Sequence, residues 1–197
     1  MQDRELRNQF NIEYQNGDSL LFEHTRTYER LPSSFTIDAG TRTTVPPGGY
    51  DYQSVRTQYS LGQQRTVSGR IAAAHGTLYE GTLTEVSYSG RVGLLPQFAV
   101  EPSVSMNWVR LPFGDFSARV INSRFIFTPN ARTAVSSFLQ YNSSSQVISA
   151  SIRLRWEYRG GSEIFVVYSD GRDTLASGYP ALLNRTFAVK ATRLIRL

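Results

Sequence analysis

The chain has 197 residues, which is enough for one domain with a sizeable core, and it has no cysteine, which excludes disulfides and thiolate metal sites. No apolar run approaches the roughly 20 residues that a membrane-spanning helix needs, so a helical membrane protein is excluded. The net charge of +5 comes almost wholly from arginine. Because these arginines are spread singly along the chain, nucleic-acid binding is not expected.

The N-terminal part of the chain predicts two β-strands joined by a tight turn. From Leu6 to Gln15, apolar Phe10 alternates with polar neighbours, which is the period of a strand. The stretch Asn16–Asp18 reads "NGD", a strong hairpin signal. A second strand, from Ser19 to Arg30, is less cleanly patterned.

A long loop rich in proline and glycine is expected from Leu31 to Gly49. Two further strands follow, near Tyr50–Ser60 and Arg65–Ala74, joined by "LGQQ". The chain from Tyr79 to Tyr141 has the most regular alternation, and its polar residues change parity near Val120 and Ile121, which predicts a β-bulge there.

The clearest strand is Val147–Tyr158, with six apolar residues on one parity and Arg153, Arg155 and Glu157 among those on the other. Helical periodicity would scatter both sets around the axis, so the pattern excludes a helix here. A second long loop is expected from Ser169 to Leu183, followed by a last strand from Asn184 to Leu197.

The pattern as a whole predicts an all-β fold of about eleven antiparallel, up-and-down strands. Strands of about 9 to 13 residues are longer than the usual 5 to 6 and suit a transmembrane β-barrel. With the C-terminus on the periplasmic side, both long loops fall on the outer side, as the rule for such barrels requires. We expect a single barrel segment over 1–197 that is incomplete and truncated at its N-terminus, because the count starts the first strand at the outer surface and no signal peptide is seen.

Several stretches also resemble a known family. They are "FTIDAGTRTTVPPGGYDY", "RTVSGRIAAAHGTLYEG", "SRFIFTPNARTAVSSFLQYNSSS", "RLRWEYRGGSEIFVVYSDGRDT" and "NRTFAVKATRLIRL". From about Leu31 onward the chain resembles the C-terminal barrel region of large bacterial outer-membrane proteins of unknown function. The resemblance implies an upstream domain similar to carbohydrate-binding modules, and it carries over no catalytic residues. The chain departs from common outer-membrane strands by ending in Leu197 rather than in an aromatic residue.

Two sets of residues are candidates for function. Charged residues on the polar parity could line a lumen, either as rings that tune permeation or as an ion-pair lattice that fills the interior: Glu85, Arg91, Arg119, Arg153 and Arg155. Aromatic residues near strand ends are interpreted as membrane-interface side chains: Trp108, Trp156 and Tyr158. His24 and His75 have no acidic neighbour at metal-ligand spacing, so no catalytic, cofactor or metal site is expected.

The sequence therefore predicts a non-enzymatic segment of a β-barrel in the bacterial outer membrane, acting as scaffold or passage for an upstream module. Its expected partners are the lipid bilayer, the outer-membrane assembly machinery, the upstream part of the same polypeptide and, through that part, a glycan or peptide. The alternative is a soluble, lipocalin-like barrel that binds a small apolar ligand.

Overall fold

The computed structural model describes residues 4–38, 40–175 and 180–195, and its regular structure is almost entirely strand. No helix in these residues is long and apolar enough to cross a membrane. The predicted all-β class is confirmed.

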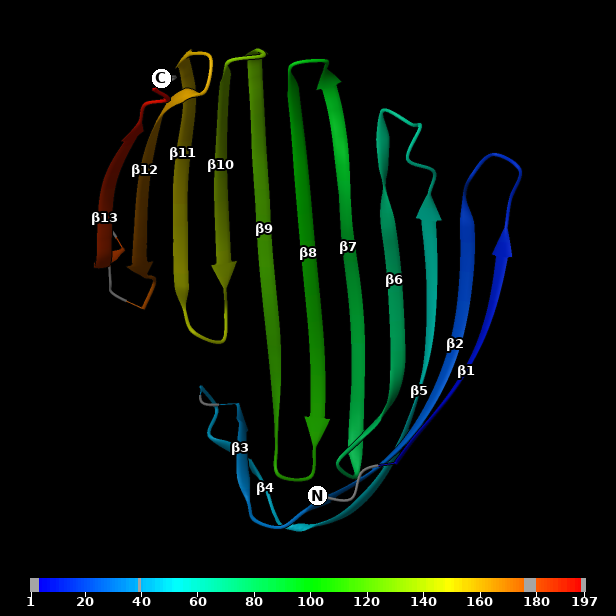
Figure 1. The fold of residues 1–197 in the computed structure, drawn as a ribbon. Helices are drawn as coiled ribbons and strands as arrows, with labels where there is room; N and C mark the ends of the chain where they lie inside the picture. The colour runs from blue at the N-terminus through cyan, green and yellow to red at the C-terminus, as the bar shows by residue number, and fades with distance from the viewer. Residues whose placement is uncertain (1–3, 39, 176–179, 196–197) are drawn as a thin grey trace. The chain divides into compact units, whose positions relative to one another are not determined.

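Eleven strands form one antiparallel sheet within the described residues, and their order in the sheet follows their order in the chain (Figure 1). The order confirms the predicted up-and-down topology and the number of strands. The strands have 10 to 17 residues, longer than most strands of globular proteins. They are β1 (Arg4–Glu13), β2 (Ser19–Leu31), β5 (Gly48–Leu61), β6 (Val67–Leu78), β7 (Gly81–Leu95), β8 (Phe98–Leu111), β9 (Gly114–Asn130), β10 (Thr133–Asn142), β11 (Val147–Arg159), β12 (Ser162–Asp173) and β13 (Ala181–Thr192).

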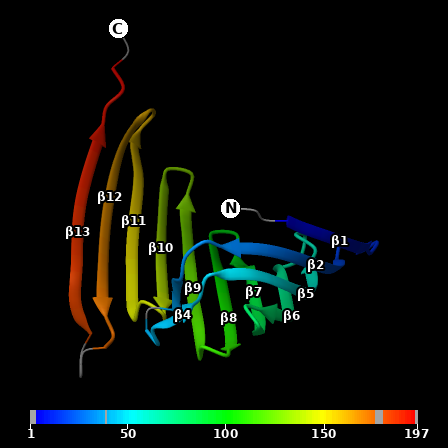
Figure 2. The same ribbon diagram turned by 90° about the horizontal axis from the view of Figure 1, so that it is seen from below.

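Contacts within the chain define two compact units. Unit 1 consists of residues 1–90 and 104–120, and unit 2 of residues 91–103 and 121–197. In unit 1, β1, β2 and β5 lie side by side (Figure 2). In unit 2, β10 to β13 do so as well.

Tight turns join most neighbouring strands. In the predicted turn between β1 and β2, Gly17 has a φ of 80°, and the backbone N–H of Tyr14 donates to the carbonyl of Asp18 at 2.9 Å. Between β6 and β7, Tyr79 and Glu80 have φ values of 46° and 67°, the left-handed pair of a two-residue hairpin turn. Neither is glycine or asparagine, so composition gave no signal for this turn.

The stretch predicted as a loop from Leu31 to Gly49 differs in the structure. It holds a two-stranded hairpin, β3 (Phe35–Asp38) and β4 (Thr43–Val45), and Gly48 already belongs to β5. The Asp38 carboxylate accepts hydrogen bonds from the backbone N–H and the hydroxyl of Thr41 at 2.7 and 2.9 Å. These side-chain hydrogen bonds stabilise the turn between β3 and β4. The loop was predicted from its proline and glycine residues, which do not indicate these bonds.

The second predicted loop, Ser169–Leu183, is shorter than expected. β12 continues to Asp173 and β13 begins at Ala181, and the pairing of these strands has a register shift between Gly171 and Arg172. Residues 176–179 of this predicted loop lie outside the described residues.

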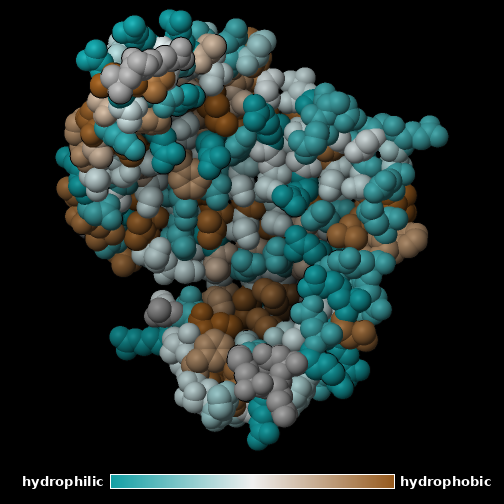
Figure 3. Space-filling view, viewed as in Figure 1, coloured by the Kyte–Doolittle hydropathy of each residue, from teal (hydrophilic) through white to brown (hydrophobic). Residues whose placement is uncertain are grey.

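The β3–β4 hairpin carries part of the hydrophobic core of unit 1. Val45 is fully buried, and the Tyr50 hydroxyl donates to the Pro46 carbonyl at 2.8 Å. Figure 3 shows brown, apolar side chains gathered beside this hairpin near the bottom of the view. The cluster consists of Leu31, Val45, Tyr50, Tyr79, Val109 and Leu111.

Close approach of the hairpin to the start of β9 requires a glycine. Gly114 has a φ of 142°, and a Cβ at this position would lie 2.9 Å from Oγ1 of the buried Thr43. A larger residue would meet both backbone strain and the hairpin itself. Apolar packing of Val45 therefore holds β4 on the core, and the lack of a side chain at Gly114 leaves room for Thr43.

We predict that Val45→Asp releases the hairpin, because it places an unpaired charge in a dry cluster. Trypsin should then cleave after Arg42 at least about tenfold faster, since about 1.4 kcal/mol of lost docking energy gives that factor. Cleavage is followed by mass spectrometry of the protein in detergent. Thr44→Asp is the control, because Thr44 is exposed on the other side of β4. Equal cleavage rates for the two variants would show that Val45 does not hold the hairpin.

Candidate functional site

Strand register divides the side chains of unit 1 between two faces, because cross-strand partners point to the same side of a sheet. One face carries the cross-strand row Glu23, Arg56 and Ala74 and is called the Arg56 face. The opposite face carries the row His24, Val55 and His75 and is called the Val55 face.

Charged groups pair along the Arg56 face. Nη1 of Arg56 lies 3.2 Å from Oε1 of Glu85, and both side chains are about two-thirds buried. Gln9 donates to Glu23 on the neighbouring strands, and Nε of Arg70 donates to Ser89 at 3.2 Å. These contacts place β7 residues Glu85 and Ser89 on the Arg56 face.

The polarity of both faces reverses along β2, β5, β6 and β7. Toward the Asn16–Asp18 turn, the Val55 face is mainly apolar and the Arg56 face is polar; toward the β3–β4 hairpin the two exchange character. On the Val55 face, the apolar side includes Leu20, Phe22, Val55, Tyr59, Ile71, Val86 and Tyr88, and the polar side includes Arg26, Asp51, Gln53, Thr77, Thr82 and Thr84.

The Arg56 face shows the complementary change. Its hairpin end holds Leu31, Tyr50, Tyr52, Leu78 and Leu83, which lie in or against the core cluster. Glu29 is the charged exception at this end, and it accepts hydrogen bonds from the hydroxyls of Tyr52 and Tyr79 at 3.1 and 2.9 Å. Burial and the bond to Glu29 raise the pKa of the Tyr79 hydroxyl, so it remains a neutral donor.

Exposure on the Val55 face is opposite to that of an ordinary soluble sheet. Val55, Ile71 and Phe22 are 55%, 53% and 40% exposed. Adjacent residues on the Arg56 face, including Arg56 and Glu85, are less exposed. Large apolar side chains gathered on one exposed face mark a surface that meets something other than water.

Unit 2 has an analogous pair of faces. Cross-strand rows place Ser136, Arg153 and Val167 on one face, called the Arg153 face, and Ser137, Ile152 and Tyr168 on the other, called the Ile152 face. The Ile152 face is apolar along β11, where Ile152 and Trp156 are about half exposed.

Ion pairs also run along the polar residues of unit 2. Glu101 lies 3.1 Å from Arg91 and 3.8 Å from Arg124, so one carboxylate serves two guanidinium groups. Arg155 pairs with Glu163 on β12, and its Nε donates at 2.9 Å.

Strand register or ion pairs place four of the five predicted lumen residues. Arg153 and Arg155 share one face of β11, Glu85 lies on the Arg56 face, and Arg91 pairs with Glu101. Arg119 lies on β9 with an exposed side chain, and its place in a lumen and the bulge near Val120 and Ile121 stay predictions.

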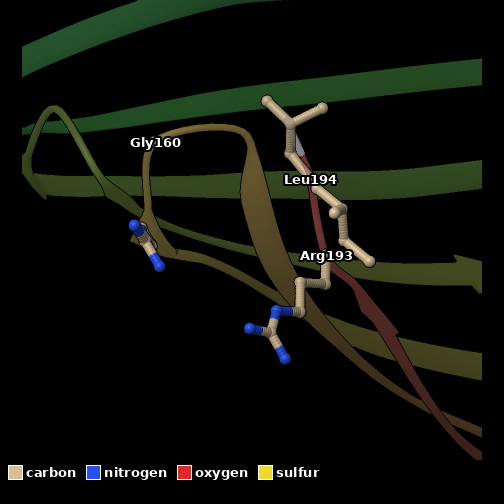
Figure 4. Close-up of a pocket in the computed structure, with 5 residues that line it drawn as sticks. Gly160, Arg193 and Leu194 are labelled. Carbon is tan, nitrogen blue, oxygen red and sulfur yellow. The ribbon is translucent and has the colours of Figure 1, made fainter. Parts of the chain in front are cut away.

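The predicted interface aromatics lie near strand ends and are partly exposed. Trp108 is 40% exposed near the end of β8. Trp156 and Tyr158 pack edge to face, with ring centroids 6.2 Å apart, and the Tyr158 hydroxyl donates to the Thr192 carbonyl at 3.3 Å. Beside this pair, a pocket of about 400 Å³ is lined in part by Arg159 and Arg193. Figure 4 shows Arg193 and Leu194 pointing in opposite directions from the chain after β13.

Sequence reasoning missed most of the acidic and basic partners. Glu101, Arg124 and Glu163 complete the ion pairs of unit 2, and Arg56 completes that of Glu85. Strand parity was the available signal, since it puts Glu101 and Arg91 on polar faces, but parity does not give the cross-strand register that brings partners together.

One charged cluster lies on the Ile152 face, which is apolar along β11. Asp170, which is 8% exposed, accepts hydrogen bonds from Arg172 at 2.6 Å, from Arg185 at 3.2 Å and from Tyr168 at 3.3 Å. Ile148 lies opposite Arg172 on β11. Mutual pairing lowers the cost of holding these charges together near the end of β12.

Asp18 ties two turns of unit 1 together. Its carboxylate accepts hydrogen bonds from Gly62 N at 2.8 Å, Tyr59 Oη at 2.7 Å and Arg65 Nη2 at 2.8 Å. These partners, led by the backbone bond from Gly62, lower the pKa of Asp18 below its ordinary value of 3.8.

Histidines and acidic residues do not gather into a metal-binding group in the described residues. Nδ1 of His75 lies 2.9 Å from the Thr84 hydroxyl. His24 lies in the same cross-strand row as His75, but Val55 of β5 lies between the two histidines.

No protein-family model and no curated protein matches the sequence. Among solved structures, the chain is similar to a KdgM porin in complex with disordered oligogalacturonate, with 11% identity and a TM-score of 0.38, covering 95% of this chain and 92% of the porin chain. It is also similar to a second KdgM porin structure, with 12% identity and a TM-score of 0.33, covering 86% and 88%. Identities of 11% and 12% with TM-scores of 0.38 and 0.33 are too low to transfer a function to this chain. Its function therefore has to be inferred from its own residues.

We predict that Asp18→Asn lowers the unfolding temperature by a few degrees at pH 7, because the ionised carboxylate holds both turns. A lowered folded-state pKa gives stability that is present above the unfolded value and is lost as the pH falls through the folded value. The difference in unfolding temperature between the two proteins should therefore shrink as the pH falls below 3.8, the ordinary pKa of the group. Circular dichroism at several pH values measures this difference. Asp51→Asn, at an exposed site, is the control; equal unfolding temperatures for wild type and Asp18→Asn at pH 7 would contradict the assignment.

Proposed function

We propose that this chain forms part of the wall of a β-barrel in the bacterial outer membrane, with its apolar faces toward lipid and its paired charges toward the interior. The polarity reversal along β2, β5, β6 and β7 carries the proposal. A strand that crosses from hydrocarbon into water needs an apolar outer face only within the bilayer. Past that depth the same face can become polar and the inner face can hold an ordinary dry core.

The reversal also favours an orientation. The apolar residues of the Val55 face lie toward the Asn16–Asp18 turn. We therefore propose that this turn lies at the periplasmic end of the barrel. The β3–β4 hairpin and its core cluster then lie beyond the outer surface, where an apolar core on the Arg56 face is compatible with water outside. Long connections at the outer end and short ones at the periplasmic end are the pattern of bacterial barrels.

The interior charges support a scaffold or passage role for this segment. Glu101 with its two arginines, and Arg155 with Glu163, place hydrated groups on faces that lipid would not tolerate. In this proposal the chain itself catalyses no reaction. An upstream module that binds a glycan or peptide, and recognition by the assembly machinery, remain predictions.

A soluble, lipocalin-like barrel is the competing proposal, and it would keep one polarity along each face. Such a barrel would turn Val55, Ile71 and Phe22 inward, yet these residues are the exposed ones. The exposure pattern favours the membrane proposal.

We predict that Ile71→Arg destabilises the folded protein in lipid vesicles by roughly 2 to 4 kcal/mol, the cost of a charge on the lipid face near the midplane. Gln53→Arg, on the same face but past the reversal, should cost about 0 to 1 kcal/mol. Both side chains are exposed, so a soluble protein would tolerate both changes to within about 0.5 kcal/mol. Urea unfolding in vesicles measures the difference, and similar small costs for both variants would refute the membrane placement.

A further inference from the structure

A groove of about 480 Å³ lies over β9 to β12 in unit 2. Two cross-strand rows of the Arg153 face form its floor, Ser136–Arg153–Val167 and Phe138–Ser151–Ser169. Arg124 from β9 completes its polar lining. The volume falls within the range of roughly 300 to 1,000 Å³ that small-molecule sites occupy.

Arg153 is the group in this groove whose charge is not balanced. The Arg153 guanidinium is exposed and makes no hydrogen bond or ion pair with any other residue that the structure describes. Its neighbours differ, because Arg155 pairs with Glu163 and Arg124 shares Glu101 with Arg91. The groove thus has one guanidinium fork available for a ligand.

We propose that this groove binds a solute that carries a carboxylate, with Arg153 as the anchor. A planar guanidinium donates two parallel hydrogen bonds to a carboxylate, and one unpaired cation matches one negative charge. Hydroxyls of Ser136, Ser151 and Ser169 offer donors and acceptors to the polar part of the solute, and Phe138 offers an apolar side. The inference rests on the proposed function, since it names the solute class that the interior of the barrel receives.

Binding is tested with two sugars of the same ring and different charge, D-glucuronate and D-glucose, by calorimetric titration of the full-length protein in detergent at low ionic strength. Glucuronate should bind at least about fivefold more tightly than glucose, because the carboxylate adds a charge-assisted contact. Equal affinity for the two sugars, or no binding of either, would overturn the proposal.

Two variants locate the site. Arg153→Gln should weaken glucuronate binding about tenfold, and Arg153→Lys should keep part of it because the charge remains. Arg155→Gln is the matched control: it removes the same charge two residues along the same face, but from an arginine that is already paired. An equal loss in both glutamine variants would show a diffuse field rather than a site, and would overturn the assignment. Should Arg153→Gln not fold, the comparison of Arg153→Lys with wild type decides.

Conductance in planar bilayers separates this proposal from the passage role. Glucuronate binding with no measurable conductance would leave the groove in place and remove the passage. Conductance that glucuronate does not reduce, together with no binding in titration, would leave the passage and remove the groove.

Discussion

Alternation is the constraint on which the structure depends: each side chain of a strand belongs to one of two faces, so a strand can satisfy two environments only by separating its residues by parity. In this chain the separation is consistent over long strands. Arg56 and Val55 are adjacent in sequence, yet Arg56 pairs with Glu85 while Val55 is exposed on the other face. The ion pairs, the core cluster and the groove all depend on the face that each residue occupies.

The reversal of polarity gives unit 1 two different regions along the same strands. Near the Asn16–Asp18 turn, charges and hydroxyls pair with one another on the Arg56 face, whereas near the hairpin Val45 and Tyr50 build a dry core on that face. Unit 2 keeps its Ile152 face apolar along β11 and concentrates its exception in one cluster around Asp170, where two arginines and a tyrosine share the cost. The charges of this cluster are therefore paired with one another.

Alternation allowed the eleven strands to be predicted from the sequence, because it is written in each strand separately. The β3–β4 hairpin could not be predicted, since Asp38 and Thr43 act through contacts with residues that a pattern does not reveal. The strand from Ser19 to Arg30 looked irregular because its polarity reverses midway. Partners such as Glu101 depend on register, which is a property of two strands and not of one.

The central claim is that the Val55 face of β5 leaves the bilayer between Gln53 and Val55. A nitroxide scan with single cysteines at Asp51, Gln53, Val55, Thr57 and Tyr59, in the full-length protein in lipid vesicles, tests it most directly. Collisions with a water-soluble nickel chelate should dominate at 51 and 53, and collisions with dissolved oxygen at 57 and 59, with the change near 55. High accessibility to the nickel chelate at all five positions would contradict the account, because the face would then lie in water along its whole length.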